Sequence, residues 1–173
     1  MAKTVDFAKL SLKDALDLAV LIEEEAKERY EEFADQMEIH HTPEAADFFR
    51  LMVSNETKHG EDLAHRRREL FRSEAVQMSR SMLWDVEAPE YDKARIFMSV
   101  RQAMEVALQS EIKAHDFFAN ALPYISDGEV RKMFEELRDE EAEHQKLIRR
   151  QLEKLPPDSG TNPEDYADEP VAQ

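Results

Sequence analysis

The chain has 173 residues, which suffices for one domain with a sizeable hydrophobic core. It carries 39 acidic and 23 basic residues, a formal net charge of −16, so nucleic acid and anionic membranes would be repelled while cations, including metal ions, would be attracted. The sequence contains no cysteine, which excludes disulfides, thiolate metal sites, iron–sulfur clusters and a cysteine nucleophile.

The composition favours an all-α fold. Only 3 glycines and 7 prolines are present, and 36% of the residues are charged, as is common in solvent-exposed helices. The first residues lack the apolar run of a signal peptide, and no segment is long and apolar enough to span a bilayer. We therefore expect a soluble, cytoplasmic protein without a membrane partner.

The first predicted helix covers residues 11–39. Ser11 is a suitable N-cap, and the acidic residue Asp14 follows one turn later. Small and apolar residues then recur at helical spacing: Leu12, Ala15, Leu16, Ala19, Val20, Ala26, Tyr30, Ala34 and Met37. Glu23 is the only charged residue on this stripe. The helix should end before Pro43, because proline disfavours a helical residue in front of it.

The second predicted helix covers residues 43–71, with Thr42 as N-cap and Pro43 in the first helical position. Its apolar stripe contains Phe49, Met52, Val53 and Leu63. Glu56 and His59 lie one helical turn apart on the same stripe. Burying a carboxylate and an imidazole is costly unless they are hydrogen-bonded or hold a cation.

The segment after this helix is expected to connect the two halves of the fold. Residues 73–92 are irregular, and a connection of this length usually crosses a helical bundle from one end to the other. We interpret Met78, Met82, Leu83 and Trp84 as packing residues of this crossover. The basic run at 66–68 is interpreted as a solvated face near the negative end of the helix dipole, in preference to an anion site.

Two further helices are predicted at about residues 93–122 and 129–155. The apolar stripe of the first contains Glu111, and that of the second contains Glu141 and His144. The expected fold is thus an antiparallel four-helix bundle, with the domain over residues 1–155. Residues 156–173 are acidic and poor in apolar side chains, so we expect a disordered tail that solubilises the chain or, alternatively, docks a partner.

The two halves of the chain repeat each other. Glu23 corresponds to Glu111 at an offset of 88 residues, and Glu56 and His59 correspond to Glu141 and His144 at an offset of 85. In an antiparallel hairpin, two residues lie at one height when the turn is midway between them. The midpoints of Glu23 with Glu56 and of Glu111 with Glu141 both fall on predicted turns. The four glutamates and two histidines should therefore meet in the core.

A buried hydrogen-bonded network without metal is the simplest alternative for these six residues. Four carboxylates in a low-dielectric core would repel one another and take up protons, and a pair of divalent cations removes that conflict. We therefore favour a dimetal site. The same spacing in Glu38 and His41 is interpreted as an exposed helix end, since it lies beside Pro43 and has no counterpart in the second half.

Two further residues could support the site. His115 lies one turn past Glu111 and is either an optional ligand or supporting group or, alternatively, an ordinary boundary histidine. Tyr30 shares a stripe with Glu23 and either hydrogen-bonds a ligand carboxylate or is an ordinary core tyrosine.

Over about residues 11–154, these motifs resemble the ferritin-like di-iron carboxylate superfamily, within it the rubrerythrin-like branch. The resemblance implies a bundle with a long crossover between its second and third helices. It also implies a dinuclear centre with iron, or alternatively manganese or zinc. The implied ligands are the outer carboxylates Glu23 and Glu111, the bridging carboxylates Glu56 and Glu141, and the histidines His59 and His144.

The resemblance implies a redox protein that reduces hydrogen peroxide or reacts with dioxygen, using electrons from an external donor, as a homodimer. Two departures weaken a strict rubrerythrin peroxidase assignment: there is no cysteine for a rubredoxin-type iron site, and Ala114 replaces an additional glutamate of the family. The alternatives are a ferritin-like iron-oxidising protein and a non-catalytic helical interaction module. A dioxygen-activating oxygenase or a manganese catalase is also compatible with this scaffold.

Overall fold

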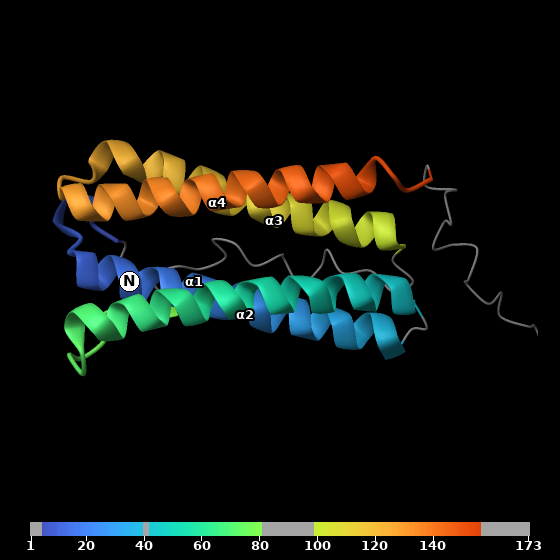
Figure 1. Ribbon diagram of the computed structural model, residues 1–173, viewed down its shortest axis with the longest axis horizontal. Coiled ribbons are helices and arrows are strands. Elements are labelled where there is room, and N and C mark those ends of the chain that lie inside the picture. The colour runs from blue at the N-terminus through green and yellow to red at the C-terminus, as the bar shows by residue number, and fades with distance from the viewer. Residues whose placement is uncertain (1–4, 40–41, 81–98, 157–173) are drawn as a thin grey trace, which may run out of the picture.

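The computed structural model describes residues 5–39, 42–80 and 99–156, and these ranges contain four long helices. They are α1 (Leu12–Ile39), α2 (Pro43–Phe71), α3 (Val100–Ala121) and α4 (Gly128–Leu152), with short 3-10 turns η1 (Phe7–Lys9) and η4 (Leu122–Tyr124). Helix α1 packs along α2 as one antiparallel hairpin and α3 along α4 as a second (Figure 1). The predicted all-α four-helix bundle is confirmed.

The first hairpin begins and ends where the sequence predicts. The backbone N–H of Asp14 donates to the Ser11 hydroxyl at 3.2 Å, so Ser11 caps α1. Thr42 precedes Pro43 as expected, but its hydroxyl donates to the carbonyl of Met37 at 3.0 Å. The Thr42 side chain therefore closes the end of α1 instead of capping α2.

The second hairpin is shorter than predicted. Its first helix begins at Val100 and not near Lys93, because Ser99 has extended backbone and forms a capping box with Gln102. Residues 93–98 themselves lie outside the described ranges. Helix α4 ends at Leu152, and the guanidinium of Arg101 donates to carbonyls of the last turn and of the residues that follow it. The predicted tail lies, after Pro156, outside the described residues.

The predicted crossover joins α2 to α3. Helix α2 finishes at one end and α3 begins at the opposite end (Figure 1), so the predicted crossover is confirmed. Met78 packs against the hydrophobic core as expected, whereas Met82, Leu83 and Trp84 lie outside the described residues.

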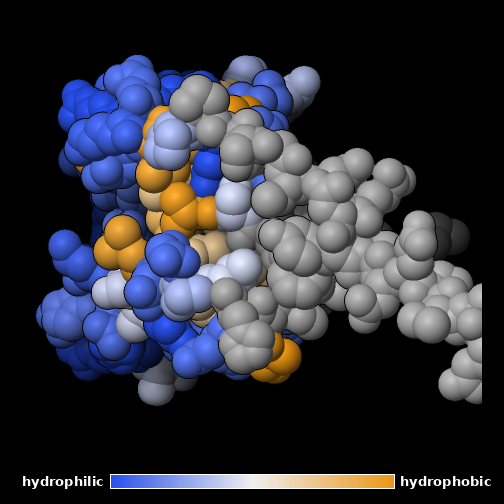
Figure 2. All heavy atoms as spheres, turned by 90° about the vertical axis from the view of Figure 1, so that its right-hand side faces the viewer, coloured by the Kyte–Doolittle hydropathy of each residue, from blue (hydrophilic) through white to orange (hydrophobic). Residues whose placement is uncertain are grey.

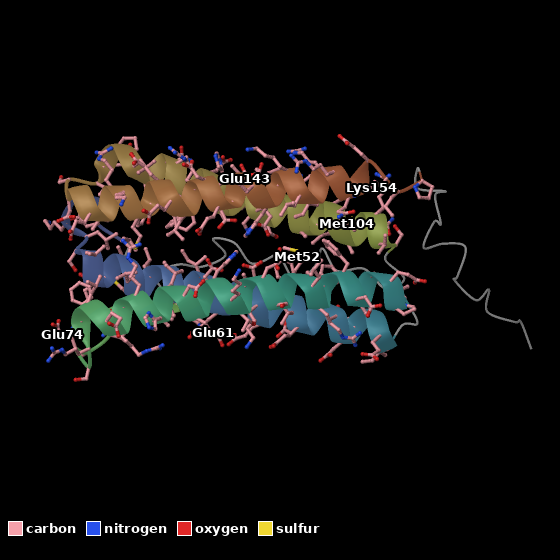
Figure 3. All side chains as sticks on the ribbon, in the orientation of Figure 1. Met52, Glu61, Glu74, Met104, Glu143 and Lys154 are labelled. Carbon is pink, nitrogen blue, oxygen red and sulfur yellow. The ribbon has the colours of Figure 1, made fainter. Side chains whose placement is uncertain are left out.

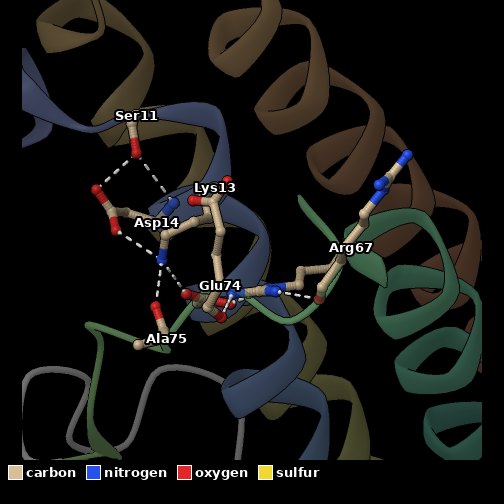
Figure 4. Close-up of polar contacts among 8 residues, drawn as sticks. Ser11, Lys13, Asp14, Arg67, Glu74 and Ala75 are labelled. Atoms are coloured by element: carbon tan, nitrogen blue, oxygen red, sulfur yellow. Dashed lines mark hydrogen bonds and ion pairs between the residues drawn. The ribbon is translucent and has the colours of Figure 1, made fainter. Parts of the chain in front are cut away.

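A buried ionic cluster anchors the start of this crossover to α1 (Figure 4). The carboxylate of Asp17 accepts from Arg67 Nε at 2.7 Å and from Lys13 Nζ at 2.9 Å. Arg67 also donates to the carbonyl of Glu74 at 2.6 Å, and Lys13 to that of Ala75 at 2.8 Å. The interpretation of residues 66–68 as a solvated face is therefore wrong for Arg67, which is only 8% exposed because it neutralises a buried carboxylate.

Two separate hydrophobic clusters fill the interior. The first contains residues from the start of α1, the end of α3 and the start of α4. The second contains residues from the later part of α1, the earlier parts of α2 and α3, and the later part of α4. At the end of the bundle where α1 finishes, hydrophobic side chains lie between two hydrophilic outer faces (Figure 2). Met52 and Met104 point between the hairpins, whereas Glu61 and Glu143 lie on the outward sides of α2 and α4 (Figure 3).

Candidate metal centre

A layer of polar side chains separates the two hydrophobic clusters. On α1, Glu23 lies between Ile22 of the first cluster and Ala26 of the second. On α3, Glu111 lies between Leu108 of the second cluster and Ala114 of the first. The polar layer is therefore enclosed by apolar side chains on both sides along the bundle axis.

Each hairpin contributes two carboxylates and one imidazole to this layer. Glu23 of α1 joins Glu56 and His59 of α2, with one potential ligand atom from each lying within 4.8 Å of the others. Glu111 of α3 joins Glu141 and His144 of α4 under the same limit. This geometry agrees with the prediction that each hairpin brings its two glutamates to one height, and the neighbouring rings of His59 and His144 bring the two groups together.

The carboxylates are almost completely inaccessible to solvent. Glu56 is 1% exposed and Glu141 is 2% exposed. Both carboxylate oxygens of Glu56, and Oε2 of Glu141, are buried without a hydrogen-bond partner. A buried carboxylate in this state is strongly unfavourable unless it takes up a proton or binds a cation.

The two histidines lie at the middle of the layer. Nδ1 of His144 is 3.0 Å from Oε2 of Glu111 and 3.5 Å from Oε2 of Glu141. Nδ1 of His59 lies farther from its carboxylates, 3.8 Å from Glu56 and 4.0 Å from Glu23. Each imidazole thus faces the glutamates of its own hairpin.

The proximity of the four carboxylates affects protonation in the metal-free protein. Burial raises the pKa of the Glu141 carboxyl well above its ordinary value, and the neighbouring carboxylates Glu111, Glu23 and Glu56 raise it further. For His144, burial alone lowers the pKa, but its hydrogen bond to Glu111 and the nearby negative charges outweigh burial and raise it. The layer therefore binds positive charge, as protons when no metal is bound.

Tyr30 and His115 differ in their relation to the site. The Tyr30 hydroxyl donates to Oε1 of Glu111 at 3.4 Å, so of the two alternatives for this residue the structure shows the hydrogen bond to a carboxylate of the site. Its ring is buried and stacks on Phe49 with centroids 6.0 Å apart. His115 belongs to neither group, and its Nδ1 lies 3.1 Å from the exposed carboxylate of Asp116.

Of the pair Glu38 and His41, the structure describes only Glu38. Glu38 is exposed at the end of α1 and forms an ion pair with Arg50. His41 lies outside the described residues.

Two residues next to the site were not predicted from the sequence. A Cβ added at Gly60 would lie 3.4 Å from the Cβ of Glu23, so α1 and α2 are in close contact at this position. Gln145 donates to the backbone carbonyl of Glu111 at 3.2 Å and links α4 to α3 beside the site. The sequence gives one signal of this close packing. It is the glycine directly after His59, because glycine is unfavourable inside a helix.

The donor set fits divalent metal ions. Carboxylate and imidazole ligands suit iron, manganese and zinc, and a pair of cations would satisfy the carboxylate oxygens of Glu56 and Glu141 that have no partner. Two hairpins that each supply such a group define a ferritin-like four-helix bundle with a candidate dinuclear metal centre.

The model of the family described as Rubrerythrin matches residues 14–152, and the chain belongs to this family. A solved crystal structure of an uncharacterized conserved protein from Magnetospirillum magnetotacticum MS-1 is similar, with 31% identity and a TM-score of 0.65. That similarity covers 87% of this chain and 99% of the other. No curated protein matches the sequence.

Within the described ranges, no helix is both long and apolar enough to cross a bilayer.

Proposed function

We propose that this chain is a dinuclear metal protein of the rubrerythrin type, with iron as its metal. The observation that carries the proposal is the buried layer of four glutamates in which the oxygens of Glu56 and one oxygen of Glu141 lack partners. Two divalent cations would neutralise these charges without protons. By resemblance to the family, Glu56 and Glu141 would hold both metals, while His59 and His144 would each hold one.

The proposed reaction is the reduction of hydrogen peroxide. Conversion of hydrogen peroxide to two water molecules breaks the O–O bond and consumes two electrons and two protons, and a bound metal pair would supply the electrons. An external donor then returns the electrons. We further propose that the protein acts as a cytoplasmic homodimer.

The side chains of the bundle would support this reaction by fixing geometry and limiting water. The two hydrophobic clusters enclose the polar layer along the bundle axis. The hydrogen bond from Tyr30 orients the Glu111 carboxylate, which also accepts from Nδ1 of His144. Such supporting contacts tune both the position and the basicity of metal ligands.

Iron oxidation with dioxygen is the second candidate. The buried Ala114 occupies the position at which the family carries its additional glutamate. This chain therefore lacks the carboxylate toward which iron moves during the redox reaction of the family. Iron oxidation that needs no such movement is compatible with the same six ligands.

Two measurements test the proposal. Elemental analysis of protein produced with supplemented iron should give two metal ions per chain, and Glu56→Ala should remove most of them, whereas the exposed Glu143→Ala should not. Rapid mixing of the anaerobic reduced protein with peroxide and, separately, with dioxygen then compares the two oxidants. Fast oxidation by dioxygen with slow oxidation by peroxide would support the second candidate. The absence of stoichiometric metal would favour the helical interaction module.

A further inference from the structure

Two openings lead from the surface to the polar layer, one on each side of α2. The larger has a volume of about 620 Å³ and lies between α1 and α2, where Glu23 and Glu56 line it. The smaller has a volume of about 160 Å³, lies between α2 and α4, and reaches the layer at His59. An ion pair between Arg66 and Glu136, 3.1 Å long, links the two helices that line this smaller opening.

The larger opening, which we call the α1–α2 groove, is acidic. Its lining contains the carboxylates Glu23, Glu24, Glu56, Glu61 and Asp62, and the basic residues Lys27 and Arg68. Glu24 is partly neutralised by Arg80 at 3.5 Å, whereas Glu61 is exposed on the outward side of α2 (Figure 3). A cleft in which carboxylates outnumber basic side chains, here five carboxylates against Lys27 and Arg68, concentrates cations and raises their rate of association.

The inner end of the α1–α2 groove offers a ligand for a cation. Glu56 lines the groove, is 1% exposed, and has two oxygens without hydrogen-bond partners. Gly60 and Ala64 lie one turn apart on the same lining, and both are too small to fill the groove. A cation that enters from solvent would therefore reach a carboxylate of the layer. In the smaller opening it would first reach the imidazole of His59.

We infer that the α1–α2 groove is the route by which divalent metal ions enter the centre. Glu61 attracts the hydrated ion at the surface, and Glu56 replaces its water molecules at the inner end. The group formed by Glu23, Glu56 and His59 is consequently loaded first. This inference rests on the proposed metal centre, and it assigns a role to residues that are not ligands of that centre.

Metal-loading kinetics test the route with Co²⁺ as the probe, because its d–d absorbance reports coordination. Metal-free full-length protein is mixed with Co²⁺ in a stopped-flow instrument at several salt concentrations. Glu61→Lys reverses a charge in the groove, and Ala64→Phe fills the groove without a charge change. Glu140→Lys is the matched control, since it makes the same charge reversal on the lining of the smaller opening.

We expect Glu61→Lys to slow loading by about tenfold at low salt, with the difference shrinking as salt increases. Ala64→Phe should slow loading at every salt concentration, and Glu140→Lys should remain within about twofold of the unchanged protein. The final Co²⁺ stoichiometry should be the same for all proteins, because none of these residues is a proposed ligand.

Equal loading rates for Glu61→Lys and Glu140→Lys would overturn the route while leaving the proposed centre intact. Because Glu61 is exposed, its replacement does not disturb the core, and this comparison does not depend on whether Ala64→Phe folds. A failure of the unchanged protein to bind Co²⁺ would instead overturn the proposed centre, and the route with it.

Discussion

The imidazole rings of His59 and His144 stack with their centroids 4.8 Å apart and their planes only 6° from parallel. One ring comes from α2 and the other from α4, so the two hairpins meet at this contact. Each Nδ1 faces the carboxylates of its own hairpin. The centre is thus built from two similar halves that share a boundary at the histidines.

The two halves should lose metal separately. Replacing His59 by alanine removes the imidazole of the first half, and we expect the number of bound metal ions to fall from two to one per chain, because the second half keeps its three side chains. Elemental analysis after removal of excess iron measures this. His115→Ala is the control and should retain both ions, since His115 belongs to neither group. Loss of both ions in His59→Ala would show that the halves do not bind independently.

The hydrogen bond between Tyr30 and Glu111 should strengthen metal binding. In Tyr30→Phe the ring that stacks on Phe49 is kept and only the hydroxyl is lost. We expect metal affinity to fall by about tenfold, as is typical for residues that orient a ligand. Competition with a chelator of known affinity measures the change. The exposed Tyr124 supplies the control variant Tyr124→Phe, and an equal loss there would contradict a specific role for Tyr30.

The Glu141 carboxyl should make the metal-free protein less stable as the pH rises. Because its pKa is raised above 4.5 in the folded state, the folded protein holds this proton to higher pH than the unfolded chain. The associated stability is present below pH 4.5 and is lost as the pH rises through the folded pKa.

Glu141→Gln should therefore stabilise the metal-free protein at neutral pH, by roughly 1–3 kcal/mol, and flatten this pH dependence. Urea unfolding in the presence of a chelator measures the free energy of unfolding. Glu135→Gln, at an exposed position of the same helix, is the control. Added metal should reverse the order, since the unchanged protein then gains a ligand that the variant lacks. A variant less stable than the unchanged protein without metal would contradict the prediction.

The Asp17 cluster should contribute stability with the opposite pH dependence. Burial alone would raise the pKa of Asp17, but the hydrogen bonds from Arg67 and Lys13 lower it below its ordinary value of 3.8. Its contribution is therefore complete above pH 3.8 and is lost as the pH falls through the folded pKa.

Asp17→Asn leaves the buried Arg67 without its counter-charge, and we expect the free energy of unfolding at neutral pH to fall by about 3 kcal/mol. Glu143→Gln breaks an exposed ion pair with Lys146 and should cause a much smaller change. Chemical denaturation at pH 7 and at acidic pH compares the two variants. Similar losses of unfolding free energy in both variants would show that the buried Asp17–Arg67 pair stabilises the protein no more than an exposed ion pair does.

The sequence alone predicted the parts of the fold that depend on periodicity. Helical spacing marked the stripes of all four helices, and the repeat of Glu56 and His59 at Glu141 and His144 identified the residues that meet in the core. The start of α3 was predicted too early, because a capping box at Ser99 overrides a helical pattern that continues in front of it. Periodicity reports which face is buried but does not report where a backbone conformation changes.

The sequence by itself determined the composition of the candidate metal centre, because side chains at matching heights in two antiparallel hairpins must converge. Only the tertiary structure decided which residues support that centre from other helices. At the centre, Tyr30 of α1 bonds Glu111 of α3, and away from it Arg67 of α2 neutralises Asp17 of α1. These partners depend on how helices rotate and approach one another, which the pattern within a single helix does not contain. The α1–α2 groove likewise depends on how these two helices pack. Its lining combines the small residue Gly60, the exposed Glu61 and the buried Glu56.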